Sequence, residues 1–172
     1  ILKGDGTETW EPKFVYHGFR FVKITGLNSK PEIKDFIGKV VYDDMKTVGE
    51  FESSDPIMNQ VYENAFWGIR GNYKGMPIDC PQRNERQPWL GDRTTGAYGE
   101  SFLFDHQTLY SKWLDDIKYS QTLDGGIPDV APAFWRYYGD GVTWQGTYIT
   151  VADMLYRQYG DVSGIRKHYP YM

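Results

Sequence analysis

The 172-residue sequence is poor in the side chains that bind metals or form covalent crosslinks. It holds a single cysteine, Cys80, and three histidines without a regular spacing. One cysteine excludes a disulfide within the chain and a cysteine-based metal site, and scattered histidines give no zinc pattern. We therefore expect neither a metal nor a cofactor. A lone cysteine does not fix the redox compartment.

Runs of basic residues and long apolar runs are lacking too. The formal net charge is −4, and lysine and arginine are dispersed along the chain. Nucleic-acid binding normally requires a basic patch, and a transmembrane helix requires about 20 consecutive apolar residues. We therefore expect no nucleic-acid partner and no membrane span. The N-terminus has neither the basic segment nor the apolar run of a signal peptide, and both ends suggest a piece of a longer chain.

Aromatic residues, by contrast, are abundant. They make up 17% of the chain and include six tryptophans and fourteen tyrosines. Large rings bury much apolar area while keeping a polar group available, so one interpretation is a rigid core. The other is a carbohydrate-binding surface, because aromatic rings stack on the apolar faces of sugars. Composition alone leaves both open.

The order of the predicted elements indicates a mainly α protein with an N-terminal β segment. Residues 13–26 and 38–44 alternate as strands do, and the pattern becomes helical after about Gly49. Asp55 or Ser54 is placed to cap a helix that has Pro56 at its first position. Further helices are expected from about Asp92 to Leu103, within 106–123, and from about Thr143 to Tyr159. We predict one domain over 1–49 and a second over 50–172.

The stretch "DCPQRNERQPWLGD", residues 79–92, concentrates charge around one aromatic ring. It contains Asp79, Arg83, Glu85, Arg86, Trp89 and Asp92. Arginine–carboxylate pairs that merely hold a surface loop together are one explanation. A sugar-cleaving pocket is the other, because glycoside hydrolysis uses a carboxylic acid and a carboxylate on either side of the scissile bond. The long loop that follows, with Asp129, Trp135 and Trp144, supports the second explanation, since long loops are often functional.

These residues resemble a known family. "DCPQRNERQPWLGD", preceded by "VYENAFWGIRGNYKGMPI" and followed by "GGIPDVAP", is similar to the bacterial α-L-rhamnosidases of glycoside hydrolase family 78. "YHGFRFVKITGL" resembles the last β-sandwich segment before their catalytic domain. The resemblance implies a partial (α/α)6 barrel preceded by the last strands of a β-sandwich. It also implies an inverting enzyme that releases L-rhamnose from glycans or glycosides. The sequence does not fix the localisation; a periplasmic or secreted protein is favoured over a cytoplasmic one.

The same resemblance assigns roles to individual residues. Glu85 corresponds to the general acid of the family. Asp79, Arg83 and Asp92 match positions that bind rhamnose hydroxyls. Trp89 matches the pocket tryptophan, and Trp144 matches a second aromatic wall.

The sequence departs from the family in three places. Gln87-Pro88 and Gln145-Gly146 replace the usual pairs, and the second change removes an acid that contacts the sugar. The family's general base is a glutamate far downstream, outside this chain. We therefore expect the isolated chain to be inactive and to need the rest of the parent chain to complete the barrel.

Two other functions stay open. The aromatic and arginine side chains also suit a non-catalytic carbohydrate-binding protein on the same scaffold. A lyase that acts on uronic acids ranks third, because only Arg93 and Arg136 are available nearby in sequence to bind a substrate carboxylate.

Overall fold

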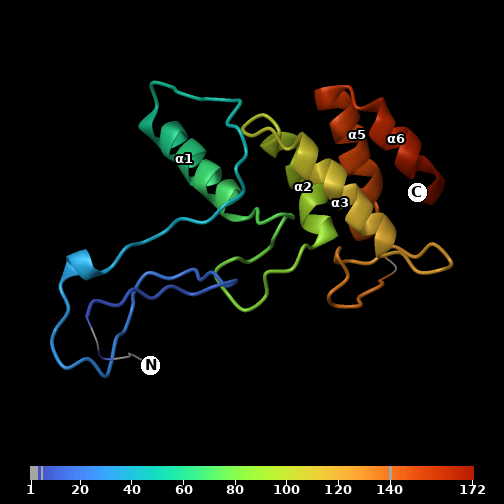
Figure 1. Cartoon of the computed structure of the whole chain (residues 1–172). Coiled ribbons are helices and arrows are strands. Elements are labelled where there is room, and N and C mark those ends of the chain that lie inside the picture. Colours follow the sequence, from blue (N-terminus) through green and yellow to red (C-terminus); the bar gives the residue numbers. More distant parts are fainter. Residues whose placement is uncertain (1–3, 5, 140) are drawn as a thin grey trace. The chain divides into compact units, whose positions relative to one another are not determined.

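The computed structural model describes residues 4, 6–139 and 141–172. It divides into two compact units, Ile1–Val41 and Tyr42–Met172. The second unit holds the residues of the predicted site (Figure 1).

The first unit is irregular over its described residues, which are 4 and 6–41. A 3-10 helix, η1, covers Ile33–Asp35, and no strand forms in the described part of this unit. The strands predicted at 13–26 and 38–44 are thus not shown by the structure. Side-chain alternation sets where side chains point, whereas a strand also needs a neighbouring strand to satisfy its backbone. Phe14 and Phe21 are exposed, so this unit buries neither of these rings.

The first helix of the second unit forms as the sequence predicts. Helix α1 spans Pro56–Gly71. The Asp55 carboxylate accepts a hydrogen bond from the Ile57 amide at 2.8 Å, which is the predicted cap. The ring of Phe66 packs on Phe104 with 4.9 Å between centroids.

Helices α2 (Leu90–Glu100), α3 (Gln107–Tyr119), α5 (Thr147–Tyr159) and α6 (Val162–His168) form the core of this unit. Helix α5 packs against α2, α3 and α6 (Figure 1). Fully buried large apolar side chains on these helices include Tyr110, Trp113, Tyr148, Leu114, Ile117 and Leu155. The mainly helical architecture is as predicted; a partial (α/α)6 barrel stays a prediction.

The predicted helix 143–159 is interrupted. Helix α4 covers Val142–Gln145, and α5 begins at Thr147. A Cβ on Gly146 would lie 2.7 Å from the Val142 carbonyl oxygen, so the tight junction between the two helices requires glycine. Helix α2 starts at Leu90, two residues before the predicted start. A 3-10 helix, η2 (Tyr169–Tyr171), follows α6.

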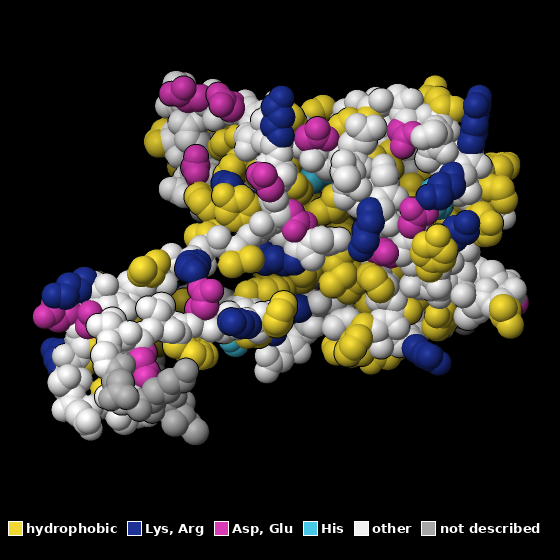
Figure 2. Space-filling view, in the orientation of Figure 1, with side chains coloured by type: hydrophobic (Ala, Val, Ile, Leu, Met, Phe, Trp, Pro, Cys, Tyr) yellow, Lys and Arg dark blue, Asp and Glu magenta, His cyan; other side chains and the backbone are white. Residues whose placement is uncertain are grey.

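Several apolar side chains reach the surface of the second unit (Figure 2). On α1 these are Ile57, Met58, Val61 and Trp67. Among the described residues, no helix combines the length and apolarity needed to cross a bilayer.

Candidate functional site

The charged stretch forms a folded-back loop between α1 and α2. The Asp79 amide donates to the Gln87 carbonyl at 2.9 Å, and the two residues form an isolated antiparallel bridge. Cys80 and Arg86, just inside this bridge, both have left-handed backbones, with φ of 53° and 54°. Such a conformation is uncommon for residues other than glycine and recurs at functional sites. The fold-back returns Glu85 to the side of Asp79.

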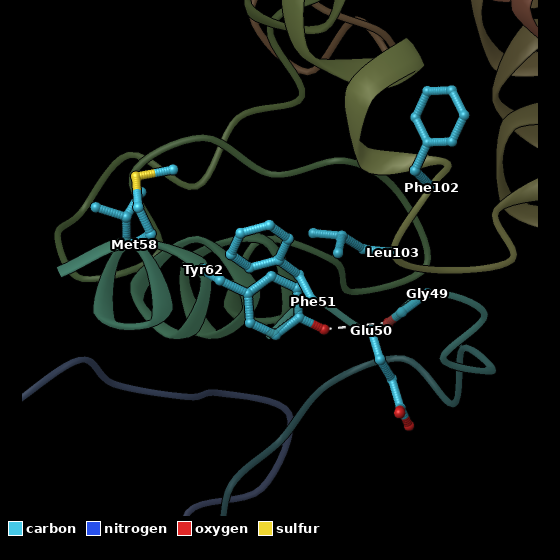
Figure 3. Close-up of a pocket in the computed structure, with 8 residues that line it drawn as sticks. Gly49, Glu50, Phe51, Met58, Tyr62, Phe102 and Leu103 are labelled. Atoms are coloured by element: carbon cyan, nitrogen blue, oxygen red, sulfur yellow. Dashed lines mark hydrogen bonds between the residues drawn. The ribbon is translucent and has the colours of Figure 1, made fainter. Parts of the chain in front are cut away.

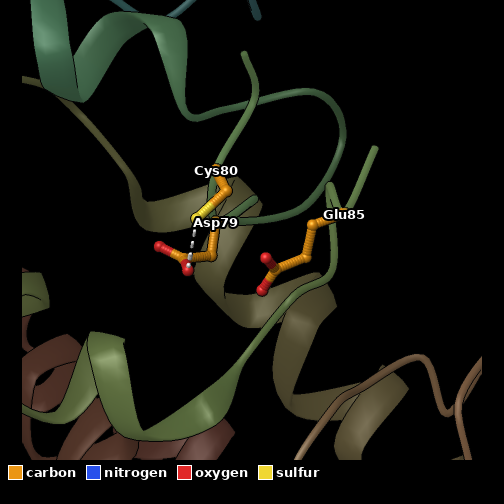
Figure 4. Close-up of side chains that lie close together, drawn as sticks. All are labelled: Asp79, Cys80 and Glu85. Carbon is orange, nitrogen blue, oxygen red and sulfur yellow. Dashed lines mark hydrogen bonds between the residues drawn. The ribbon is translucent and has the colours of Figure 1, made fainter. Parts of the chain in front are cut away.

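Asp79, Cys80 and Glu85 form a compact group at this fold-back (Figure 4). One terminal atom from each lies within 4.8 Å of the others. The Cys80 thiol donates to Asp79 Oδ2 at 3.2 Å. Desolvation, together with this hydrogen bond, raises the pKa of the thiol. The thiol thus acts as a hydrogen-bond donor to the Asp79 carboxylate.

The Glu85 carboxylate is held from two directions. Oε1 accepts a hydrogen bond from the Trp89 indole at 2.8 Å, and Oε2 pairs with the Arg83 guanidinium. The Glu85 side chain is 17% exposed, whereas that of Arg83 is 62% exposed. The Glu85 carboxylate is therefore oriented by two partners, one of which, Arg83, is largely exposed to solvent.

The first turn of α2 carries Asp92, and Trp144 packs directly against this turn. A Cβ on Gly91 would lie 2.5 Å from the Trp144 ring, so only glycine lets the indole rest on the helix. Partial burial and the neighbouring charge of Asp79 raise the pKa of Asp92. The structure thus brings Trp144 to the residue beside Asp92, and Asp92 into electrostatic reach of Asp79.

A second loop, residues 127–139, runs beside the motif. Leu90 donates its amide to the Asp129 carbonyl at 2.9 Å, and Trp89 and Val130 form a bridge. The Gln145 amide nitrogen donates to Asp129 Oδ1 at 2.8 Å and to the Gly139 carbonyl at 3.0 Å. Gln145, which the sequence marked only as a departure from the family, therefore clamps this loop. The Asp129 carboxylate accepts one of these hydrogen bonds, and we call this set of contacts the Gln145 clamp.

Three rings from the two loops form a cluster, which we call the aromatic trio: Trp89, Trp135 and Tyr137. Trp89 stacks on Tyr137, with centroids 5.9 Å apart and planes 12° apart. Trp135 meets both rings edge-on, at 6.4 Å and 5.9 Å. Sequence reasoning missed Tyr137, although its position two residues after Trp135 in an aromatic-rich loop was a usable signal.

Behind the site, a buried polar network anchors α2. Arg93 donates to Glu100 Oε1 at 2.8 Å, and the hydroxyls of Tyr73 and Tyr110 bond to each other at 2.8 Å. Glu100 Oε2 accepts from the Tyr73 hydroxyl, and the single proton of the Tyr110 hydroxyl is directed either to Glu100 Oε2 or to Tyr73. No sequence pattern indicated this network, because its members come from separate segments.

An apolar groove lies beside α1 (Figure 3), and none of the residues of the 79–92 loop lines it. It has a volume of about 340 Å³ and is lined by Gly49, Glu50, Phe51, Met58, Val61, Tyr62, Phe102 and Leu103. Its lining offers one carboxylate and no arginine. The groove therefore lacks the convergent polar groups of a sugar site.

The structure brings together most of the residues that the sequence singled out. Asp79, Arg83, Glu85 and Trp89 contact one another directly or through a shared partner. Asp92 and Trp144 lie at the start of α2, which follows Trp89 without a break. Carboxylates, a guanidinium and indole rings on rigid loops can bind sugar hydroxyls and apolar sugar faces.

Curated relatives that are similar to this chain are named as α-L-rhamnosidases. The chain is 40% identical over 161 residues to an α-L-rhamnosidase of Streptomyces avermitilis. The alignment covers 93% of this chain and 16% of that protein. It is 35% identical over 174 residues to one from Formosa agariphila, with 100% of this chain and 19% of that protein covered. The chain thus spans less than a fifth of the length of these relatives.

Solved structures similar to this chain are also α-L-rhamnosidases. The α-L-rhamnosidase from Dictyoglumus thermophilum has a TM-score of 0.89 at 40% identity, over 94% of this chain and 18% of that one. The Streptomyces avermitilis enzyme, solved in complex with L-rhamnose, has a TM-score of 0.91 at 37% identity, over 99% of this chain and 16% of that one.

Two family descriptions match consecutive parts of the sequence. Residues 1–42 match the bacterial α-L-rhamnosidase concanavalin-like domain. Residues 46–172 match the bacterial α-L-rhamnosidase six-hairpin glycosidase domain. With that match over most of its length, the chain belongs to the bacterial α-L-rhamnosidase family of six-hairpin glycosidases.

Proposed function

We propose that this chain is part of a glycoside hydrolase that releases terminal α-L-rhamnose from glycans or glycosides, with Glu85 as the general acid. The observation that carries the proposal is the fixing of the nearly buried Glu85 carboxylate by Trp89 and Arg83. A general acid must reach the leaving-group oxygen in a defined orientation. The names of the relatives, and the rhamnose complex of one of them, supply the sugar.

The remaining residues bind the sugar in this proposal. Asp79, Arg83 and Asp92 accept from or donate to rhamnose hydroxyls, because they surround Glu85 and keep polar atoms available. The exposed face of Trp144 packs on the apolar face of the sugar. We assign residues 1–49 to the end of a β-sandwich domain and residues 50–172 to the first part of the catalytic domain.

We further propose an inverting mechanism whose general base lies outside this chain. In an inverting enzyme the two carboxyl groups are about 6.5–9.5 Å apart, which leaves room for the attacking water. Asp79 and Glu85 have oxygens within 4.8 Å of each other. Asp79 is thus too close to Glu85 to serve as the base, and a carboxylate on another segment is needed.

The stereochemistry of the product tests this mechanism in the complete protein. Proton NMR during the first minutes of hydrolysis should detect β-L-rhamnose before it equilibrates. The α-anomer as first product would contradict inversion. It would point instead to Asp79 as a nucleophile, because a retaining pair is about 5–5.5 Å apart.

Replacement of the acid tests the role of Glu85. In the complete protein, Glu85→Gln should lower turnover of alkyl or disaccharide rhamnosides by about 10²–10⁴-fold, the usual worth of a general acid. The loss should be much smaller for nitrophenyl rhamnosides, whose leaving group needs no proton. Turnover is measured by rhamnose release from both substrates.

The matched control is Glu63→Gln, at an exposed position of α1. It should behave as the wild type. Equal losses of Glu85→Gln on both substrates would refute the acid role. Rhamnose binding by the wild type without any turnover would favour the non-catalytic carbohydrate-binding protein instead.

A further inference from the structure

We propose that Thr147 and Gln145 are positioning residues of the sugar site, which hold the Trp144 indole against the first turn of α2. This inference rests on the proposed function, because there Trp144 packs on the apolar face of rhamnose. It adds two residues that act on sugar affinity through Trp144.

Trp144 lies on a helix that has little stability of its own. Helix α4 covers only four residues, Val142–Gln145, and isolated helices shorter than about 12–15 residues are marginal in water. The Trp144 side chain is 39% exposed, so its surroundings do not enclose it. The position of the indole therefore depends on the contacts that join α4 to its neighbours.

Thr147 makes the first link, from the start of α5 to the start of α2. It is fully buried, and its hydroxyl donates to the Leu90 carbonyl at 2.7 Å. The next residue of α2, Gly91, is the one on which the Trp144 ring rests. The hydrogen bond thus joins α2 to the segment of Trp144 directly beside the place where the indole meets the helix.

Thr94 adds a polar contact to this link. The single proton of its hydroxyl is directed either to the Thr143 carbonyl, at 3.0 Å, or to the Thr147 hydroxyl. In both arrangements the proton of Thr147 is available to the Leu90 carbonyl. Helix α2 is therefore bonded to the segment of Trp144 on both sides of the indole.

Gln145 makes the second link, through the loop of residues 127–139. Its amide nitrogen donates to Asp129 Oδ1 at 2.8 Å. The Asp129 carbonyl accepts in turn from the Leu90 amide at 2.9 Å. Leu90 is therefore held twice, through its carbonyl by Thr147 and through its amide by way of the Gln145 clamp.

The two links close a ring of contacts beside the indole. It runs from Leu90 through Asp129 to Gln145 and then along the backbone. Thr147 closes the ring by its bond to Leu90. Trp144 precedes Gln145 in this ring, so the segment that carries the indole is fixed before a sugar arrives. A preorganised surface loses less conformational entropy on binding, which favours affinity.

The test measures the dissociation constant of L-rhamnose for the complete protein by isothermal titration calorimetry. Thr147→Val removes the hydroxyl, keeps the shape, and should raise this constant about fivefold to tenfold. Thr147→Ser keeps the hydroxyl and should stay within about twofold of the wild type. The control is Thr150→Val, the same change at an exposed position of α5, which should bind as the wild type does.

A double-mutant cycle shows whether Thr147 acts through Trp144. Trp144→Ala alone should raise the dissociation constant about tenfold, because the aromatic contact with the sugar is lost. In that background Thr147→Val should add less than about twofold, because the effects of coupled residues are not additive. Full additivity would overturn the proposal. So would a wild-type constant for Thr147→Val, or equal losses for Thr147→Val and Thr147→Ser.

Gln145→Ala tests the second link, and it takes the place of Thr147→Val in the cycle if that variant does not fold. It removes the donor to Asp129 and should also raise the dissociation constant of L-rhamnose, with little further effect in the Trp144→Ala background. A wild-type constant for Gln145→Ala would overturn the role of Gln145.

The proposed function fails in a distinguishable way. If Trp144→Ala binds L-rhamnose as the wild type does, Trp144 does not contact the sugar, and its assignment in the proposed function fails together with this inference. If Trp144→Ala weakens binding while Thr147→Val and Gln145→Ala do not, only this inference fails. Because binding is measured without turnover, the outcome does not depend on Glu85 as the acid.

Discussion

At the scale of single residues, neighbouring positions of α2 have opposite environments. Asp92 is exposed, whereas Arg93 is 8% exposed and paired with Glu100. A buried pair contributes orientation more than stability, because both charges lose their hydration. Here the Glu100 carboxylate is also bonded by the hydroxyls of Tyr73 and Tyr110, which tie α2 to the segment after α1 and to α3.

His106 shows how burial controls a titratable group beside this network. The ring is fully buried among Tyr73, Phe104 and Tyr110. Within the described residues, neither of its nitrogens has a hydrogen-bond partner. Desolvation lowers the pKa of His106 to about 4 from 6.5, and Glu100, Arg93 and Asp105 are the charged groups that act on it.

The lowered pKa predicts a pH dependence of stability. The unfolded chain binds a proton at this histidine below about pH 6.5, whereas the folded chain does so only near pH 4, so protonation favours unfolding between these values. His106→Leu should remove this contribution, which is about 3 kcal/mol by pH 4. The measurement is urea unfolding at pH 7.5 and at pH 4 for both proteins.

Burial also lowers the pKa of His168, so acid should lower the free energy of unfolding of both proteins. The free energy of unfolding should fall less between the two pH values for His106→Leu than for the wild type. An equal fall in both proteins would mean that His106 takes up its proton without unfolding.

At the scale of elements, close contacts decide where glycine is required. Residues 46–48 run beside 103–105, and Val48 donates its amide to the Leu103 carbonyl at 2.9 Å. Gly49 follows this pairing, and a Cβ on it would lie 1.9 Å from the Phe102 carbonyl oxygen. Because that atom belongs to the backbone, a rotamer change cannot relieve the clash.

Two glycine substitutions should therefore have opposite effects. Gly49→Ala should lower the free energy of unfolding by about 2 kcal/mol or more, as overpacking does. Gly68→Ala, at an exposed position of α1 with open space around it, should raise it by about 0.5–1 kcal/mol. Thermal unfolding of both variants checks this, and a neutral Gly49→Ala would show that the two segments separate easily.

Elements with local signals were predictable from the sequence. Helix α1 has its cap, its proline and its apolar face in consecutive residues. The break at Gly146 and the early start of α2 depend on what the backbone contacts, which the sequence does not reveal. The strands predicted at 13–26 are not shown by the structure, and strand pairing likewise depends on a second segment.

At the scale of the whole molecule, some residues of the site were predictable from the sequence and others were not. The motif residues were predictable because they are consecutive and carry a specific pattern of charge and aromatic side chains. The Gln145 clamp, the trio and the network of Tyr73, Glu100 and Tyr110 were not, because each joins separate segments of the chain. A sequence can thus indicate the reacting groups more readily than the residues that position them.

We expect the 172-residue chain by itself to be inactive. With Glu85 as the proposed acid, Asp79 has an oxygen within 4.8 Å of it, which is closer than the separation an inverting pair needs for a water. The purified 172-residue chain should therefore release no rhamnose from nitrophenyl α-L-rhamnoside above the uncatalysed rate, whereas the complete protein should. Rhamnose release by the chain, abolished by Asp79→Asn, would place both carboxylates of the mechanism within it.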